Sequence, residues 1–499
     1  MSQGDSILIV NRDPVELEKA IRKAGHRSSL PSDEMDHLPF AVEKEVPLLG
    51  TVKRALLIDG GDSSYGDDVV VMMRRLGVVD EPGFYKDLYM MVSHFHADHQ
   101  AGLHGVLATK QPSQKKGKRP GYLLRYVPGK IFVNPLYEKA TVPKNKLFPA
   151  FMEIITKISD LSRGASRTQV VTVLPGGLDP SVTFRRPLTI SLGDGATDRN
   201  GHRIPIDIRM VASGQRVYHP AKKDLDDVPP KGKNKNAVDM NDRSLCFMLT
   251  YGSFRFFSGG DIAGDGKDVG GNFLLNAMSD RPTSKKNSKK KKNKKIGSSH
   301  GDVETVLGPA LEAAFPATPT EKRKPGFDRF PFNGHATVMK ASHHASASSV
   351  DVHFLTTIRP YVVAISCGFK ARAHDHPTQQ VLNRLHRTAT AEWGVRGTTA
   401  KVPNSVEGLY LTEVVKKRKG RTYDTHVGDG RLVGDIVIRP TDDSIVSVRA
   451  SASGLPRVKV QVYGTGDQTD TSDSGNELFD SAGDTRGPYP IGPYEHPRS

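Results

Sequence analysis

Cysteine is scarce in this chain: the 499 residues include only Cys246 and Cys367. Both lie in short apolar runs, which is typical of buried thiols in a reducing compartment and argues against a disulfide framework or a cysteine-rich zinc site. Aromatic residues make up 7% of the chain, with a single Trp. A broad base-stacking platform for nucleic acid is therefore not evident.

Long hydrophobic runs are missing too. No segment approaches the length of a membrane span, and the apolar patch at residues 7–10 follows no basic stretch of the kind that opens a signal peptide. We therefore expect a cytoplasmic protein without a membrane span. The length and the 36% of hydrophobic residues are enough for a globular core.

Positive charge is what the chain has in excess. Its formal net charge is +16, and eight lysines lie between residues 285 and 295. Such a run favours a polyanionic partner such as nucleic acid, although a solvated surface loop is the commoner explanation. We interpret residues 111–121, 221–237 and 281–301 as low-complexity insertions in one domain spanning 1–462. The polar residues 463–499 are expected to be a disordered tail.

The most informative stretch is Ser93-His94-Phe95-His96-Ala97-Asp98-His99. It follows the apolar run 88–92, which has the length and flanking charges of a buried strand, so a loop at a strand end is expected here. A single His in an apolar setting is usually structural. Three imidazoles and a carboxylate within six positions are instead a set that zinc binds and manganese tolerates, so this stretch predicts a metal site.

Further candidate ligands follow other predicted strands. Asp59 comes after residues 54–58, and Asp261 comes after a predicted hairpin at 245–257 and the pair Gly259-Gly260. Glycine permits the tight turn that leaves a carboxylate at a strand end. Such turns are common, however, and they gain weight only beside the histidine cluster.

Two more histidine motifs lie further along the chain. The pair His343-His344 follows a predicted strand at 336–340, and His374-Asp375-His376-Pro377 precedes a predicted helix at 378–386. His376 is either part of a site or an ordinary polar residue at a helix start that Asp375 caps. Asn241 and Ser244, just before the hairpin, either bind a phosphate or cap that hairpin.

In this order the motifs resemble the metallo-β-lactamase superfamily. Gln3-Gly4-Asp5-Ser6, Asn241-Asp242-x-Ser244, Gly260-Asp261, His343-His344 and His376-Pro377 resemble, more narrowly, the soluble hydrolase domain of ComEC-type competence proteins. The resemblance runs from about residue 1 to 462. It implies an α/β fold of the αββα sandwich type, interrupted here by the basic insertions.

The resemblance also implies two divalent metal ions, zinc or manganese, and a role for each matched residue. His94 and His96 would bind the first ion, Asp98 and His99 the second, with Asp261 as the bridge, His343 or His344 as the remaining ligand, and Asp59 as a brace for the metal loop. The family often adds a His to the first ion; only His104, His202 and His219 lie in that interval, and none matches a motif. Ala345 stands where the family has Gly.

The activity implied is that of a phosphodiesterase or nuclease acting on DNA or RNA. Two close cations would share a hydroxide that attacks phosphorus, and Asp98 is a candidate catalytic residue as a ligand there. His376, or the non-ligand of His343 and His344, would protonate the leaving alkoxide. Asn241 and Ser244 are candidate substrate-binding residues.

Two alternatives remain open at this point. One keeps the metals but changes the substrate to a lactam, lactone, thioester or small cyclic nucleotide, because a fold does not fix a function. The other is a non-catalytic protein that binds polyanions through its basic loops.

Overall fold

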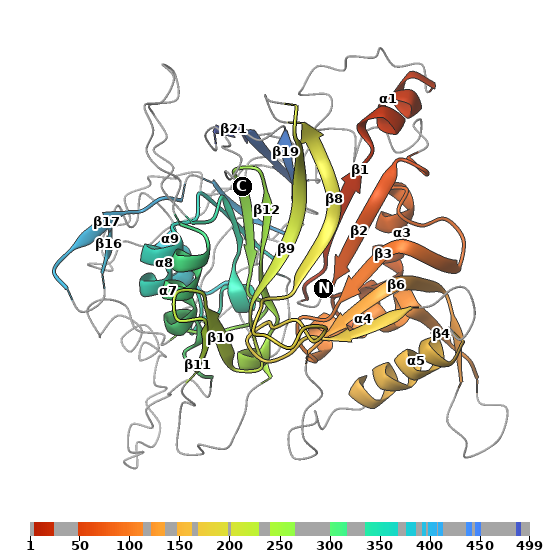
Figure 1. The fold of residues 1–499 in the computed structure, drawn as a ribbon, viewed down its shortest axis with the longest axis horizontal. Helices are drawn as coiled ribbons and strands as arrows, with labels where there is room; N and C mark the ends of the chain where they lie inside the picture. Colours follow the sequence, from red (N-terminus) through yellow and green to blue (C-terminus); the bar gives the residue numbers. More distant parts are fainter. Residues whose placement is uncertain are drawn as a thin grey trace, which may run out of the picture.

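The computed structural model has two β-sheets that face each other, with helices on their outer sides (Figure 1). The residues that the structure describes are 4–23, 48–112, 121–134, 147–161, 168–197, 201–228, 240–264, 300–316, 335–367, 376–385, 392–395, 398–406, 408–412, 436–441, 445–450 and 486–490. Most of the predicted insertions at 111–121 and 281–301 lie outside these residues.

The first sheet has the strand order β1-β2-β3-β6-β7. β1 runs antiparallel to β2, and the other neighbours are parallel, so the carboxyl ends of β2, β3, β6 and β7 meet at one edge. Consecutive residues face opposite sides, as in any strand: Leu56 packs toward the second sheet, and Leu57 packs toward the helices. The strands are β1 (Ile7–Arg12), β2 (Val52–Ile58), β3 (Gly83–Met91), β6 (Tyr126–Val133) and β7 (Gln169–Thr172).

The second sheet has the strand order β18-β15-β14-β13-β12-β9-β8. β8, β9, β12 and β13 pair antiparallel, whereas β13, β14, β15 and β18 pair parallel. The strands are β8 (Thr189–Thr197), β9 (Arg203–Ser213), β12 (Cys246–Tyr251), β13 (Phe254–Ser258), β14 (Val338–Lys340), β15 (Val362–Ile365) and β18 (Gly408–Leu411).

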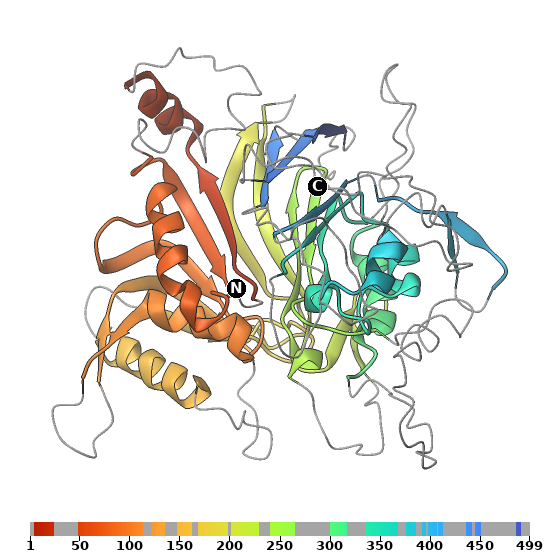
Figure 2. The same ribbon diagram turned by 180° about the vertical axis from the view of Figure 1, so that it is seen from behind.

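Three apolar clusters hold these layers together. One lies between the two sheets, one joins the first sheet to α3 (Gly66–Arg75), α4 (Ala97–Leu107) and α5 (Leu147–Leu161), and one joins the second sheet to α7 (Val303–Ala314), α8 (Val352–Ile358) and α9 (Gln379–Leu385). Figure 2 shows the two helix groups on opposite outer sides. The order of layers is therefore helices, sheet, sheet, helices.

Smaller elements complete the described chain. They are α1 (Pro14–Lys23), η1 (Ser63–Tyr65), β4 (Ala108–Lys110), β5 (Tyr122–Leu124), β10 (Arg216–His219), β11 (Asp224–Asp227), η3 (Asn241–Arg243), η4 (Ser342–Ala345), β16 (Glu392–Gly394), β17 (Lys401–Pro403), β19 (Ile436–Thr441), β20 (Ile445–Ala450) and β21 (Arg486–Pro490). No helix in the described part of the chain is both long enough and apolar enough to cross a bilayer.

The expected mixed α/β class is confirmed, and three local differences appear. Asp98 and His99 were expected in a loop, but they lie in the first turn of α4, where the helix dipole favours a carboxylate. Part of the predicted insertion at 221–237 forms β11, which pairs with β10. Part of the predicted tail forms β21, which pairs with β20; its sequence, rich in Gly and Pro, hides the strand from pattern reading.

Candidate metal centre

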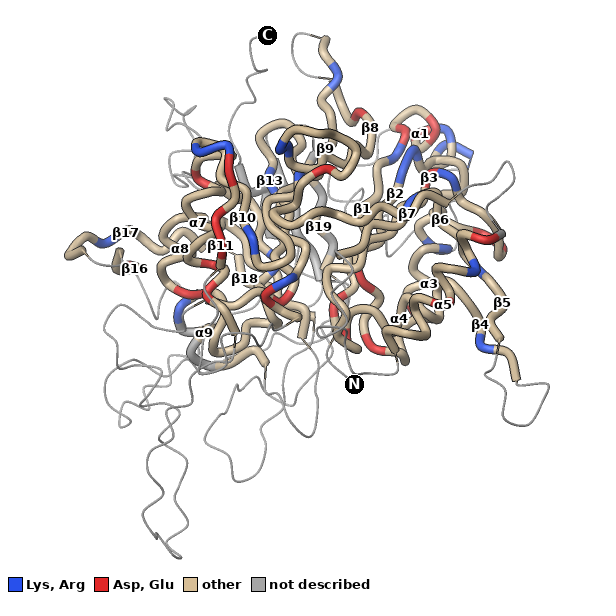
Figure 3. The backbone as a smooth tube through the Cα atoms, turned by 60° about the horizontal axis from the view of Figure 1, so that its bottom comes forward, with Lys and Arg blue, Asp and Glu red and all other residues tan. Residues whose placement is uncertain are grey.

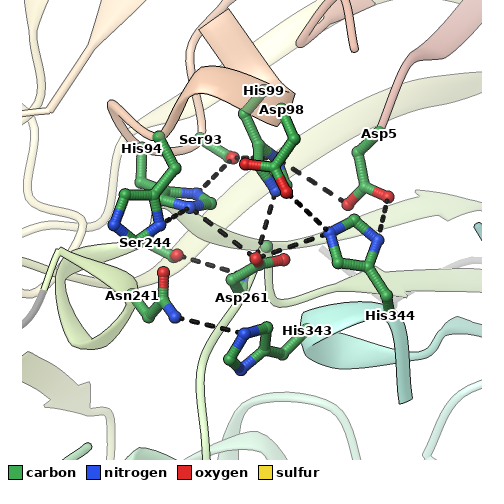
Figure 4. A network of polar contacts seen from close by, with 12 residues as sticks. Asp5, Ser93, His94, Asp98, His99, Asn241, Ser244, Asp261, His343 and His344 are labelled. Carbon is green, nitrogen blue, oxygen red and sulfur yellow. Dashed lines mark hydrogen bonds and ion pairs between the residues drawn. The ribbon is translucent and has the colours of Figure 1, made fainter. Parts of the chain in front are cut away.

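Polar side chains from both sheets meet where several strands end (Figure 4). Asp59 follows β2, His94 follows β3, and Asp98 and His99 begin α4. The second sheet contributes Asp261, after β13, and His344, after β14. Asp5 joins them because it precedes β1, whose start pairs with the end of β2. Ligand sites commonly lie at the carboxyl ends of strands, so the position suits a functional centre.

Glycine allows the backbones to come this close. A Cβ on Gly102 of α4 would clash with the carbonyl oxygen of Gly60, just after β2. The approach lets the Gly60 N–H donate to the carbonyl of His99 at 2.7 Å. This hydrogen bond holds the start of α4, with Asp98 and His99, against the end of β2.

Three imidazoles point at one carboxylate oxygen. The distances from Nε2 to Asp261 Oδ2 are 3.2 Å for His99, 3.6 Å for His344 and 3.8 Å for His94. Asp98 approaches from the helix, with its Oδ2 at 3.6 Å from His344 Nε2. All except Asp98, which is 28% exposed at its side chain, are almost completely buried.

The Nδ1 atoms of His94 and His99 face Ser93 and Asp59. Asp59 Oδ2 lies 2.8 Å from His99 Nδ1, and its Oδ1 accepts the N–H of Ser93 at 2.8 Å. The hydroxyl of Ser93 donates to Asp59 and lies 3.1 Å from His94 Nδ1. Since a carboxylate can only accept, the proton of His99 belongs on Nδ1. Asp59 therefore contacts both Ser93 and His99 of the predicted metal loop.

His344 is oriented in the same manner by other residues. Its Nδ1 donates to the carbonyl of Ser366 at 3.0 Å and lies 3.3 Å from Asp5 Oδ1. Both partners are acceptors, so they hold a proton on Nδ1, and a metal ion that displaces the other proton would find the lone pair on Nε2, which faces Asp261. A carboxylate or carbonyl behind the imidazole is the usual outer contact of a metal-binding His.

The backbone of the His pair is held in an unusual conformation. His343, His344 and Ala345 have φ values of 48°, 51° and 60°, in the left-handed region that non-glycine residues seldom adopt. The conformation sends the two adjacent imidazoles in different directions, with ring centroids 6.4 Å apart. It also explains why a Gly would suit the position that Ala345 occupies.

The electrostatics of the cluster favour cations. Burial by itself would raise the pKa of Asp261, but His99 and His344 hold it well below its ordinary value. Burial lowers the pKa of His344, but Asp261 and Asp5 outweigh it and raise that pKa to about 10. Burial, together with His99, lowers the pKa of His94. Buried carboxylates thus draw positive charge onto neighbouring rings, which is the environment that a bound cation would satisfy.

The geometry fits a divalent metal ion. Two atoms bound to the same zinc at about 2.1 Å in a tetrahedral arrangement lie about 3.4 Å apart. The inner distances in this cluster are similar, at 3.2 to 3.8 Å. The Nε2 atoms of His99 and His344 are buried and make no hydrogen bond to any described residue. His94, His99 and Asp261 form one group able to hold an ion, and Asp98, His99 and His344 form another.

Other predicted site residues lie around this inner cluster. His96 Nδ1 is 3.1 Å from His94 Nε2, but His96 belongs to neither of the two groups above. His343 has its Nε2 3.4 Å from Asn241 Nδ2 and belongs to neither group. The ring of His376 lies 5.5 Å from that of His343 and 6.4 Å from that of His344. These side chains lie at the edge of the inner cluster and belong to neither group able to hold an ion.

The side chain of Ser244, a candidate for binding substrate, contacts the backbone of Asp261 instead. Its side chain is buried, and its hydroxyl accepts the N–H of Asp261 at 3.1 Å. A Cβ on Gly260 would clash with Ser244, and Gly260 has a φ of 59°, so this turn requires glycine. Ser244 is therefore placed to hold the turn that presents Asp261, which corresponds to the capping alternative.

Among the described residues, none of the three histidines considered as an additional ligand joins a metal group. His104 stacks on Phe151 of α5 with a 5.8 Å ring separation, and burial lowers its pKa to about 4. His202 is exposed, and His219 lies in β10. His374 falls outside the described residues.

Sequence reasoning did not assign roles to Asp5, Ser93 or Lys340. Asp5 and Ser93 occur in the motifs quoted above, so their positions beside strand ends were a usable signal. Lys340 had none, being one of 71 basic residues in the chain. Comparison with known proteins adds no further guide, because no family model matches this chain and no curated protein matches it.

Proposed function

We propose that this protein is a metal-dependent hydrolase of the metallo-β-lactamase type, and that its substrate is a phosphodiester of a nucleic acid. The observation that carries the proposal is the convergence of His94, His99 and His344 on Asp261. The layer order of helices, sheet, sheet, helices supports the fold assignment, since the resemblance implies a sandwich with this order of layers.

The inner residues would hold two ions, and Asp261 and His99 would lie beside both of them. His94 would complete the first site, and Asp98 and His344 the second; His96 is close enough to His94 to join the first. Bound divalent ions would supply Lewis acidity to the phosphate and lower the pKa of a bound water. Asp59, Asp5 and Ser93 keep the ligand rings in the required orientation.

The bordering residues are suited to the substrate. His343 is half-buried, its pKa is lowered to about 4 because its ring is partly removed from water, and its Nδ1 makes no hydrogen bond to a described residue. A neutral imidazole of this kind can donate a hydrogen bond to a phosphate oxygen. His376 lies beside it and remains our candidate for protonating the leaving group.

The described residues that flank the lysine-rich stretch in the sequence support a nucleic-acid substrate. Gly264 comes three residues after Asp261, and the ring of His300 lies 5.2 Å from that of His343. The eight lysines of residues 285–295 lie in the sequence between these two positions. Lysines hold nucleic acid by non-specific phosphate contacts.

Several described basic residues lie away from the candidate site. Figure 3 shows Lys and Arg positions around α1, β2 and β3. Lys53 and Arg54 lie in the first half of β2, whereas the candidate metal centre lies beyond its last residue. These two residues are thus not placed to hold a phosphate at the site, whereas the lysine-rich segment is our candidate for that role.

The test is cleavage of labelled single- and double-stranded DNA and RNA by purified protein with zinc or manganese. We expect the wild type and the control Asp68→Asn, an exposed carboxylate of α3, to cleave, and Asp98→Asn to lose cleavage. Replacing the eight lysines by Gln should weaken nucleic-acid binding and its salt dependence while leaving metal binding intact.

Other outcomes would point to the alternatives. Hydrolysis of a lactam, lactone, thioester or cyclic nucleotide, without cleavage of nucleic acid, would retain the metal chemistry and reject the nuclease. Metal-loaded protein that binds nucleic acid but cleaves none of these substrates would support the non-catalytic binding protein.

A further inference from the structure

Lys340 is a lysine buried among carboxylates. It ends β14 with 2% of its surface exposed. Its Nζ forms an ion pair with Asp5 Oδ2, donates to the carbonyl of Gly260 at 3.2 Å, and lies 3.8 Å from Asp261 Oδ1. An ammonium group is seldom buried this deeply unless it is paired, so the position calls for an explanation.

The ion pair divides the two oxygens of Asp5 between different tasks. Oδ2 faces Lys340, whereas Oδ1 lies 3.3 Å from His344 Nδ1. Asp5, Asp59 and His99 form a third group in which a cation would fit. The ammonium of Lys340 already supplies positive charge to this group. Because Asp5 is paired with that ammonium, it stays behind the ring of His344.

Lys340 also supports the other side of the cluster. By donating to the carbonyl of Gly260, it contacts the turn that presents Asp261, and this turn has little freedom because Ser244 holds the Asp261 N–H. The Lys340 side chain thus contacts Asp5, behind the ring of His344, and the turn that places Asp261 in front of that ring. His344 and Asp261 must face the same ion for the second metal site to form.

We infer that Lys340 is a positioning residue for the metal centre, which holds Asp5 against Nδ1 of His344 and fixes the Gly260-Asp261 turn so that His344 Nε2 and Asp261 Oδ2 face one metal ion. This inference rests on the metal binding of the proposed function but not on the identity of the substrate. Without the ammonium, Asp5 loses the ion pair at its Oδ2 and is free to turn toward the metals.

The experiment compares Lys340→Met with the double variant Lys340→Met/Asp5→Asn, which removes both charges of the pair together. Lys130→Met, on β6 away from the cluster, is the matched control. Zinc and manganese are titrated into chelator-treated protein by calorimetry, and the melting temperature of each metal-free protein is recorded. The double variant keeps the test usable if Lys340→Met alone fails to fold.

We expect Lys130→Met to bind metal like the wild type, and Lys340→Met to bind at least about tenfold more weakly, as for other outer contacts of metal ligands. The double variant should melt close to the wild type when metal-free and still bind at least about tenfold more weakly. A double variant that binds metal as tightly as the wild type overturns the inference. A wild type that binds metal tightly but hydrolyses no nucleic acid would reject only the nuclease, whereas a wild type that binds no metal rejects both.

Discussion

Two of the groups of buried acidic residues in the described chain differ in their hydrogen bonding. In the candidate metal centre, the Nε2 atoms of His99 and His344 face Asp261 Oδ2 and make no hydrogen bond to a described residue. Behind the second sheet, Glu304 of α7 is also fully buried, but its two oxygens accept the N–H groups of Val350 and Asp351 at 2.8 and 2.9 Å. Buried polar atoms are nearly always hydrogen-bonded, so two ring nitrogens that are not, and that face one carboxylate oxygen, support the proposed metal site.

The Glu304 group has a structural task. Val350 has a φ of 55°, which is unusual for a β-branched residue, and Arg384 donates to its carbonyl at 3.2 Å. Asp351 caps α8 by accepting the N–H of Phe354 at 2.7 Å. These contacts hold the loop between the His pair and α8. The comparison teaches that burial and charge alone do not distinguish a binding site from a brace.

The largest effect is expected from Asp261→Asn. An amide is a poor ligand and cannot balance two ions. Since loss of an outer contact already costs up to about 100-fold, loss of this ligand should lower metal affinity and hydrolysis by at least that factor. Metal content after dialysis and cleavage of labelled DNA measure the two effects. Retention of normal metal content would show that the unpaired atoms do not mark the metal site.

A matched pair of adjacent substitutions sharpens the assignment within the cluster. His344→Gln should weaken metal binding by about 10- to 100-fold, because its Nε2 faces Asp261. His343→Gln should keep metal affinity within about threefold while it slows hydrolysis. Calorimetric titration with zinc or manganese decides between them. Equal losses of metal affinity in both variants would contradict the geometric assignment.

The opposite pattern is expected at Glu304. Glu304→Leu leaves two backbone N–H groups unpaired, each costing about 1–3 kcal/mol, so the free energy of unfolding should drop by about 2–6 kcal/mol. Metal affinity of the folded fraction should stay unchanged. Denaturant unfolding measures the loss, and Glu312→Leu, an exposed position on the same helix, serves as the control. A selective loss of metal binding would mean that the two groups are not separate.

The smallest effect concerns pH. Burial, reinforced by Asp351, raises the pKa of Glu304 well above its ordinary value of 4.5. An acid whose pKa is raised by folding stabilises the protein fully below its unfolded pKa and loses that contribution as the pH rises toward the folded pKa. We therefore expect the stability of the wild type, relative to Glu304→Gln, to fall as the pH rises above about 4.5. Unfolding of both proteins across pH 4–8 tests this, and a constant difference would refute it.

Most of the candidate site was predictable, because the polar motifs follow apolar runs whose periodicity predicts strands. Asp59, Asp98, His99 and Asp261 were all assigned in this way, and the structure brings them together. The role of Ser244 was not predictable, because a hydroxyl beside a turn is equally able to bind a ligand or a backbone N–H. The role of Lys340 could not be predicted, because it depends on an ion pair with Asp5, which is far away in the chain.

The sequence by itself determined the mixed α/β class and the strand ends that carry the polar residues, because hydrophobic periodicity and glycine turns are local properties. Only the tertiary structure decided which of two adjacent histidines faces Asp261. That choice depends on Ser366 and Asp5 behind the ring of His344, and on a left-handed backbone at three successive residues. Such contacts join distant parts of the chain, so no local pattern encodes them.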